Sequence, residues 1–467
     1  FLFRRLFLHL RQREGVAVLR PHIVDYGVSI GIIDRDAVHD GVVFGKYAVG
    51  QLGRSLLQGL IEQDMPLFRS GECKQGVLHH ITGRDADPAV LLAARSVVDN
   101  ARQDAVFCLV FQLRQAVVEV TNRCNLRCPH CASVSGRARA DEMSLGELRQ
   151  VMRDLAALGC RTVTLLGGEF LLRPDWYEVA ASVKAVDMEL QLITNGLLVT
   201  EAVRAQFKAL APRAVGVSLD GATPESYRRT RGVDGYATCR RLLDDLVADG
   251  HRQVTAITTF TSRNLGDFDL FAETFKDTPI LWQIQVAHRA GERFDDALLL
   301  SPDQFAWYAE RVTHCLYNLN GRLKIGTMDD FGYFPLTPKL RFLHQVWTGC
   351  PAGRHVIGIR ANGDILPCLS LGNDFIEANL RVRPLKAIWR DPESFHAFRQ
   401  KEHALSGMCA KCPFGRQCKA GCSAAALSTT GTLGENLFCV RRVETEKILN
   451  DMLSTSTEET ENEAEHD

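Results

Sequence analysis

The sequence lacks a long hydrophobic segment and an excess of charge of either sign. No apolar run in its 467 residues approaches the roughly 18 residues that a membrane-spanning helix needs. The formal net charge is −1, whereas nucleic-acid-binding proteins usually carry a strong basic excess. The apolar, arginine-rich start also lacks the small-residue cleavage site of a secretory signal. We therefore expect neither a membrane nor a nucleic acid among its partners.

Cysteine, by contrast, is abundant and unevenly placed. Of 15 cysteines, three lie within residues 124–131 and five within residues 409–439. Disulfide frameworks are typical of small secreted domains, but short cysteine spacings in a long chain without an export signal indicate metal ligands. The two clusters therefore predict cysteine-ligated metal sites.

Six β-branched or apolar runs alternate with helical patterns in the middle of the chain. The runs are 117–121, 162–166, 189–194, 214–219, 253–260 and 280–286. Ser144 and Glu147 predict a capping box for a helix that Gly159 ends, and Ser301 with Pro302 begins another. Such alternation predicts an α/β fold with a parallel sheet of buried strands. Six units fall short of the eight of a complete barrel, so a partial (β/α)6 barrel is expected.

Polar and glycine residues follow the carboxyl ends of these strands. They are Gly167, Gly168, Glu169, Asn195, Ser218 and Asp220. Because this edge builds the active site in β/α barrels, we expect them to lie near the site.

The first cysteine cluster lies in the loop after the first predicted strand. Thiolates suit iron–sulfur clusters, and a four-iron cluster is normally saturated by four cysteines. Cys124, Cys128 and Cys131 would leave one iron open to bind a substrate or cofactor. The same spacing fits a zinc site completed by His130 or a distant residue, or three unrelated buried thiols.

The string TNRCNLRCPHC around these cysteines resembles the motif of the radical S-adenosylmethionine (SAM) superfamily, with His130 at its usual aromatic position. The resemblance continues in order and spacing through LLGGEFLLRPD, ITNG, VSLDG and RRTRG, over roughly residues 113–290. It implies a [4Fe-4S] cluster whose open iron binds the amine and carboxylate of SAM.

The resemblance also gives roles to the glycine turn. Gly167 and Gly168 would let the backbone approach SAM, which side chains would block. Glu169 would accept a charge-assisted hydrogen bond from the methionyl ammonium. The alternative for Glu169 is a solvated surface acid after a glycine turn.

The remaining cofactor contacts follow from the same resemblance. Asn195, Ser218 and Asp220 are placed to bond the ribose hydroxyls, although Asn-Gly and Asp-Gly are also ordinary turns. Arg231 resembles the family's arginine that faces the methionyl carboxylate. The implied reaction is reductive cleavage of SAM to a 5′-deoxyadenosyl radical, which abstracts hydrogen from a substrate. The cofactor supplies the chemistry and the protein supplies binding and orientation.

A second set of seven cysteines, together with Gly363, resembles the SPASM domain of radical enzymes that modify peptides and proteins. The cysteines are Cys350, Cys368, Cys409, Cys412, Cys418, Cys422 and Cys439. By resemblance, Cys350, Cys368 and Cys422 hold one auxiliary [4Fe-4S] cluster, and the other four hold a second. A zinc ribbon is the alternative, because C-x2-C pairs also bind zinc.

The first auxiliary cluster has only three evident ligands. Some relatives place a fourth cysteine where this chain has His344. Either His344 ligates the cluster, or one iron is open to substrate. The alternative is that His344 is an ordinary surface or packing histidine. The cysteines left over are expected to be buried structural thiols; they are Cys73, Cys108, Cys160, Cys239 and Cys315.

Four regions are expected along the chain. Residues 1–112 have no clear fold and either hold a precursor-binding module or form an unrelated extension. Residues 113–325 are the barrel and 326–446 the SPASM domain, while the acidic tail 447–467 is expected to be disordered.

The SPASM resemblance points to a peptide or protein substrate, and maturation of a ribosomally made peptide is the leading hypothesis. The alternatives are a maturase of a peptide-derived cofactor and an anaerobic sulfatase-type maturase. The latter is disfavoured, because Leu369 follows Cys368 at the position where those relatives have an aspartate that acts as the base. An iron–sulfur electron carrier or scaffold would not need a SAM pocket. A flavodoxin- or ferredoxin-type reductant and a reducing cytoplasm are expected, since exposed iron–sulfur clusters are oxygen-sensitive.

Overall fold

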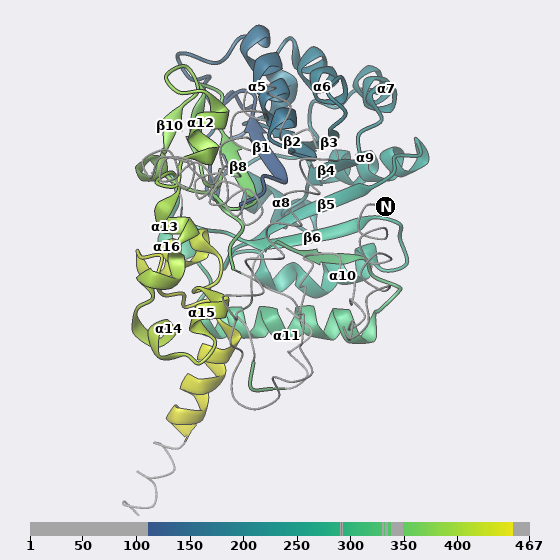
Figure 1. Ribbon diagram of the computed structural model, residues 1–467. Coiled ribbons are helices and arrows are strands. Elements are labelled where there is room, and N and C mark those ends of the chain that lie inside the picture. The colour runs from purple at the N-terminus through teal and green to yellow at the C-terminus, as the bar shows by residue number, and fades with distance from the viewer. Residues whose placement is uncertain are drawn as a thin grey trace, which may run out of the picture. The chain divides into compact units, whose positions relative to one another are not determined.

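The computed structural model describes residues 111–289, 291, 293–328, 331, 335–337 and 349–451. They belong to a unit that runs from Val106 to the end of the chain and is shown in Figure 1. The predictions for His344, Cys73 and Cys108, and almost all of those for residues 1–112, fall outside the described residues.

Ten strands in the described part of the chain form one sheet, in the order β10-β9-β8-β1-β2-β3-β4-β5-β6-β7. Its central strands are β1 (Gln115–Glu119), β2 (Thr162–Leu166), β3 (Glu189–Thr194), β4 (Ala214–Ser218), β5 (Val254–Phe260) and β6 (Leu281–Val286). Neighbours among these six pair in parallel. The predicted α/β fold is therefore confirmed, and each predicted strand is found with its ends shifted by two residues or fewer.

The sheet extends beyond the six predicted strands on both sides. β7 (Ile325–Thr327) pairs in parallel with β6, and β8 (Val356–Ile359) pairs in parallel with β1. Two short antiparallel strands, β9 (Asp364–Leu366) and β10 (Ala378–Asn379), complete the edge. The C-terminal region that carries the second cysteine set thus shares one sheet with the barrel (Figure 1).

Helices connect the parallel strands. They are α5 (Leu145–Ala157), α6 (Trp176–Lys184), α7 (Glu201–Leu210), α8 (Pro224–Arg231), α9 (Tyr236–Ala248), α10 (Phe268–Phe275) and α11 (Pro302–Asn318). The predicted capping boxes at Ser144 and Ser301 are both present. Gly159 adopts a left-handed φ of 83° just after α5, as expected of a residue that ends a helix.

An aromatic cluster fixes the lower side of the sheet. Phe260 of β5 and Trp282 of β6 pack against Phe268 and Phe271 of α10 and Tyr308 of α11. All five side chains are fully buried, and each such burial contributes about 1.5–3 kcal/mol. α10 and α11 lie beside β6 (Figure 1), and this packing joins the two helices to the sheet.

Short helices make up most of the C-terminal region. They are α12 (Leu385–Arg390), α13 (His396–Arg399), α14 (Gly407–Lys411), α15 (Gly415–Cys418) and α16 (Ser423–Thr430). A further helix covers 440–451, so the first residues of the predicted disordered tail are helical. Arg442 supports this helix through ion pairs with Glu435 and Glu446.

None of the described helices is both long enough and apolar enough to cross a membrane.

Candidate active site

The loop after β1 folds into a tight turn that carries three free thiols, those of Cys124, Cys128 and Cys131. The backbone N–H of Cys131 donates to the carbonyl of Cys128 at 3.3 Å, and that of Leu126 donates to the sulfur of Cys124 at 3.3 Å. The N–H of Cys124 donates to the carbonyl of Gly136 at 3.2 Å. The loop is therefore closed at both ends and holds its sulfurs in place.

The environment of these thiols fits a cluster. Burial raises the pKa of Cys124 and of Cys128, and the charge of Cys131 raises both further. Thiolate charges that oppose one another in this way can be offset by a cationic partner such as iron. Within the described residues, no three His, Cys, Asp or Glu side chains gather closely enough to hold a single ion. A four-iron cluster suits more widely spaced thiols, because each thiolate binds a different iron.

Gly167 and Gly168 follow β2 and lie against the cysteine loop. A Cβ at Gly167 would lie 2.4 Å from the carbonyl oxygen of Thr121, and one at Gly168 would lie 2.3 Å from that of Arg123. The Cβ at Gly168 would also lie 2.7 Å from the Cβ of Cys124. The sequence predicted that these glycines admit SAM; the structure shows that they admit the backbone of the cysteine loop.

Glu169 is buried beside this turn, with a relative exposure of 1%, so the surface-acid alternative is wrong. Its carboxylate accepts hydrogen bonds from the hydroxyl of Thr194 and from the backbone N–H groups of Asn195 (2.8 Å) and Leu171 (3.3 Å). Burial raises the pKa of Glu169 to about 7, although these donors oppose the rise. A buried carboxylate of this kind is suited to receive a cation.

The end of β3 is tied to the same loop. The side-chain amide of Asn195 donates to the side-chain oxygen of Asn125 at 2.7 Å. Its own oxygen accepts from the N–H of Leu197 at 3.0 Å, which is the local turn bond typical of Asn-Gly. Ser218 ends β4 and is half-buried at the same edge of the sheet.

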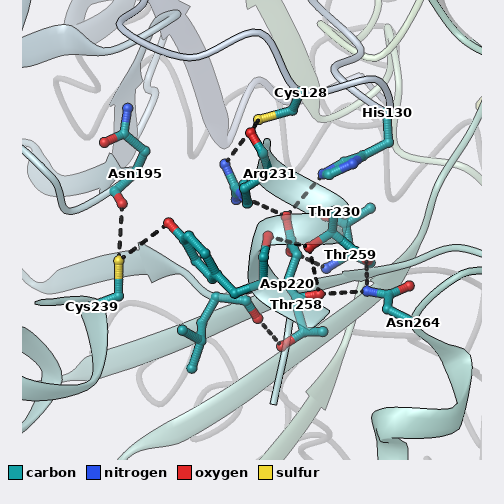
Figure 2. A network of polar contacts seen from close by, with 12 residues as sticks. Cys128, His130, Asn195, Asp220, Thr230, Arg231, Cys239, Thr258, Thr259 and Asn264 are labelled. Carbon is teal, nitrogen blue, oxygen red and sulfur yellow. Dashed lines mark hydrogen bonds and ion pairs between the residues drawn. The ribbon is translucent and has the colours of Figure 1, made fainter. Parts of the chain in front are cut away.

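A network of charged groups joins the cysteine loop to β4 and α8 (Figure 2). One carboxylate oxygen of Asp220 lies 2.9 Å from Nε2 of His130 and 2.7 Å from Nε of Arg231. The other accepts from the N–H of Thr259 at 2.8 Å. Arg231 in turn places Nη1 3.7 Å from the sulfur of Cys128. The sequence predicted a ribose contact for Asp220, but both of its oxygens are engaged by protein donors.

The electrostatics of Asp220 follow from this arrangement. Its side chain is 0% exposed, and burial alone would raise its pKa. Arg231 and His130 more than offset the burial and hold the pKa of Asp220 at about 2. The carboxylate is therefore ionised at every physiological pH and links a loop histidine to a helix arginine.

Contacts within the second cysteine set join some of its members. Cys350 shares a hydrogen bond with Cys422 and lies close enough to Cys368 for their charges to interact. Cys409 and Cys412 interact in the same way.

Backbone contacts fix Cys409 and Cys418. Cys409, on α14, hydrogen-bonds to the backbone of Asn436, three residues before Cys439. Cys418 ends α15, and its N–H donates to the carbonyl of Phe414 at 2.8 Å. Of the five cysteines assigned to neither set, Cys160, Cys239 and Cys315 are described and buried.

Two family models match the chain where these cysteines lie. That of the radical SAM superfamily matches residues 118–275, and that of SPASM, an iron-sulfur cluster-binding domain, matches residues 350–413. The chain is a radical SAM enzyme with a SPASM domain. Its cofactors are accordingly SAM and iron–sulfur clusters.

Curated relatives of this radical SAM enzyme differ in what they make. The AdoMet-dependent heme synthase of Methanosarcina barkeri is 29% identical over 344 residues, which cover 69% of this chain and 95% of that protein. The mycofactocin maturase MftC of Mycobacterium ulcerans is 28% identical over 70% of this chain and 85% of its own length. The PqqA peptide cyclase of Rhizobium meliloti is 25% identical over 68% of this chain and 83% of its own.

Solved structures share the fold. Streptococcus suis SuiB bound to its precursor peptide SuiA superposes with a TM-score of 0.59 at 15% identity, over 84% of this chain and 88% of SuiB. The anSMEcpe enzyme with bound AdoMet and a Cp18Cys peptide gives 0.55 at 18% identity, over 74% of this chain and 99% of that one.

Sequence reasoning missed two residues at this site, Asn264 and Asn125. Asn264 donates to the backbone carbonyls of Asp220 at 2.8 Å and Thr259 at 3.0 Å, and Asn125 meets Asn195 from the cysteine loop. Asn264 lies four residues after β5, so the rule that polar residues at strand ends belong to the site would have found it.

The affinity for SAM should depend on the ionisation of Glu169. Protonation removes the charge that attracts the methionyl ammonium, so affinity should fall as the pH drops through about 7. With that pKa, about tenfold is lost between pH 8 and pH 6. Equilibrium dialysis of SAM against the anaerobically reconstituted protein measures this. Glu169→Gln should bind weakly and show no such pH dependence; an unchanged pH profile in this variant would exclude the role.

Proposed function

We propose that this enzyme uses SAM-derived radical chemistry to modify a peptide substrate. The observation that carries the proposal is the convergence at one edge of the sheet of three elements. These are the thiols of the cysteine loop, the carboxylate of Glu169 and the Asp220–Arg231 ion pair. Two relatives in the comparison, a mycofactocin maturase and a peptide cyclase, support the substrate class.

In this proposal each residue of the edge binds or orients SAM. Cys124, Cys128 and Cys131 would hold a [4Fe-4S] cluster, which when bound would supply the one electron needed for reductive cleavage of SAM. Glu169 accepts the methionyl ammonium, and Arg231, held by Asp220, presents its positive charge to the carboxylate. Ser218 and Asn195 are placed for the ribose.

The SPASM cysteines would hold two auxiliary [4Fe-4S] clusters, with Cys350, Cys368 and Cys422 on the first. The remaining ligands are Cys409, Cys412, Cys418 and Cys439. A flavodoxin- or ferredoxin-type protein would deliver electrons, and the reducing cytoplasm is the compartment that preserves such clusters.

The test is a turnover assay with the reconstituted full chain, dithionite and SAM. A short precursor peptide encoded next to the gene should increase the release of 5′-deoxyadenosine, and the mass of that peptide should change. A scrambled peptide should have neither effect. Release of 5′-deoxyadenosine without any change in that peptide would contradict peptide modification and leave the radical chemistry standing.

Heme synthesis is a second candidate, favoured by the heme synthase match over 95% of that relative's length. The same assay, with an iron-containing tetrapyrrole precursor in place of the peptide, would then produce the absorption spectrum of heme. A sulfatase-type reaction is less favoured, because Leu369 packs with an apolar cluster beside Cys368 and carries no carboxylate to act as a base.

A further inference from the structure

A buried lysine lies among the SPASM cysteines. Lys401 begins the 3-10 helix η7 (Lys401–Ala404) and has a relative exposure of 1%. Its ammonium donates to the carbonyl oxygens of Gly421 at 2.9 Å and Ala420 at 3.4 Å. Burial of a charge is costly unless polar groups receive it, and carbonyl groups receive it without neutralising it. Lys401 therefore places a positive charge inside the domain.

The two carbonyls belong to an unusual turn. Lys419, Ala420 and Gly421 adopt φ values of 56°, 53° and 61°, so three consecutive residues are left-handed. That conformation is unfavourable for residues with a Cβ and persists only where its surroundings hold it. Lys401 binds the second and third residues, and its neighbour Glu402 forms an ion pair with Lys419 at 2.9 Å.

The turn leads directly to a cluster cysteine. Cys422 follows Gly421 and shares a hydrogen bond with Cys350. The carbonyl oxygens that accept from the Lys401 ammonium, those of Ala420 and Gly421, belong to the two residues directly before Cys422. Lys419 also packs against the residue before Cys350, since a Cβ on Gly349 would lie 3.0 Å from its side chain. The turn before Cys422 is thus bound by Lys401 and Glu402 of η7, and through Lys419 it contacts the residue before Cys350.

We propose that Lys401 is a positioning residue of the first auxiliary cluster. It holds the left-handed turn so that Cys422 faces Cys350, and it keeps a positive charge beside these ligands. This inference rests on the proposed assignment of Cys350, Cys368 and Cys422 as ligands. A nearby positive charge stabilises the reduced cluster, which carries one more electron, and therefore raises its reduction potential.

Three variants of the full chain separate the two effects. Lys401→Gln removes the charge and keeps a donor for the carbonyls, whereas Lys401→Met removes both. Lys411→Met is the matched control, because Lys411 lies between Cys409 and Cys412 but is exposed to water. Each anaerobically reconstituted variant is assayed for iron and titrated with a reductant while the clusters are followed by electron paramagnetic resonance.

Both Lys401 variants should lower the midpoint potential of one auxiliary cluster, and Lys401→Met should in addition lose iron from it. Lys411→Met should leave that potential unchanged. The proposal is overturned if Lys401→Gln keeps the wild-type potential, or if Lys411→Met shifts the same cluster equally. Wild-type protein that binds iron only at the cysteine loop would instead contradict the proposed auxiliary clusters.

Discussion

Cys128→Ala should abolish the release of 5′-deoxyadenosine. Cys128 is the buried thiol of the cysteine loop, and it is the one that contacts Arg231. With two thiols left, the loop cannot retain the cluster that starts the reaction. Because enzymes accelerate reactions by about a millionfold or more, the rate should fall at least about a thousandfold. Chromatography of the nucleoside after incubation with SAM and dithionite measures the loss.

Cys160→Ala is the matched control for this experiment. Cys160 is also buried, but its thiol donates to the backbone carbonyls of Arg114, just before β1, and of Thr162, the first residue of β2. Both lie at the amino ends of their strands, away from the site. The Cys160→Ala variant should keep its activity and an iron content of about twelve per chain. The iron content of Cys128→Ala should fall to about eight. Full activity in Cys128→Ala, or twelve irons retained there, would contradict the assignment of the loop.

Asp220→Asn should strongly destabilise the protein. The substitution preserves the shape of the side chain but leaves Arg231 buried without its counter-charge. Removal of one partner of a buried ion pair costs about 3–5 kcal/mol. The free energy of unfolding from denaturant titrations should fall by that amount. The affinity for SAM should fall as well, since Arg231 and His130 lose their common anchor.

The pH dependence gives a second check on Asp220. Its pKa in the folded protein is lowered to about 2 from an ordinary value of 3.8. The stability it contributes is therefore present above pH 3.8 and is lost as the pH falls through about 2. Asp303→Asn, at an exposed position of α11, should change stability by about 0.5 kcal/mol or less. An equal loss in the two variants would contradict the anchoring role.

The central strands were predictable because local physics decides them. The run 214–219 is mostly buried and the run 189–194 is buried at every second residue. Both are rich in β-branched and apolar residues and stop at Asn-Gly or Asp-Gly. The strands that the sequence did not predict have no such signal. β7 and β8 contain three and four residues, and β8 exists because it pairs with β1, more than 200 residues earlier in the chain. A pairing of that kind depends on tertiary packing rather than on local propensity.

The site was predictable where a motif fixes both residue type and spacing, as for Cys124 and Glu169. The network around Asp220 was not, because it joins residues up to 103 positions apart, from the cysteine loop to α8. Lys401 also escaped notice, since lysine is seldom fully buried and its sequence context gives no sign of burial. In both cases the role of the buried charge depends on which groups surround it in the folded protein.

The pairing of β8 with β1 limits how this protein can be cut or recombined. A chain that stopped before residue 349 would leave β1, the strand that positions the cysteine loop, with an unpaired side. Unpaired strand edges recruit other chains and aggregate. The two cysteine regions are thus parts of one folding unit, and an exchange of SPASM domains between relatives would have to carry β8 with a register that matches Gln115–Val118.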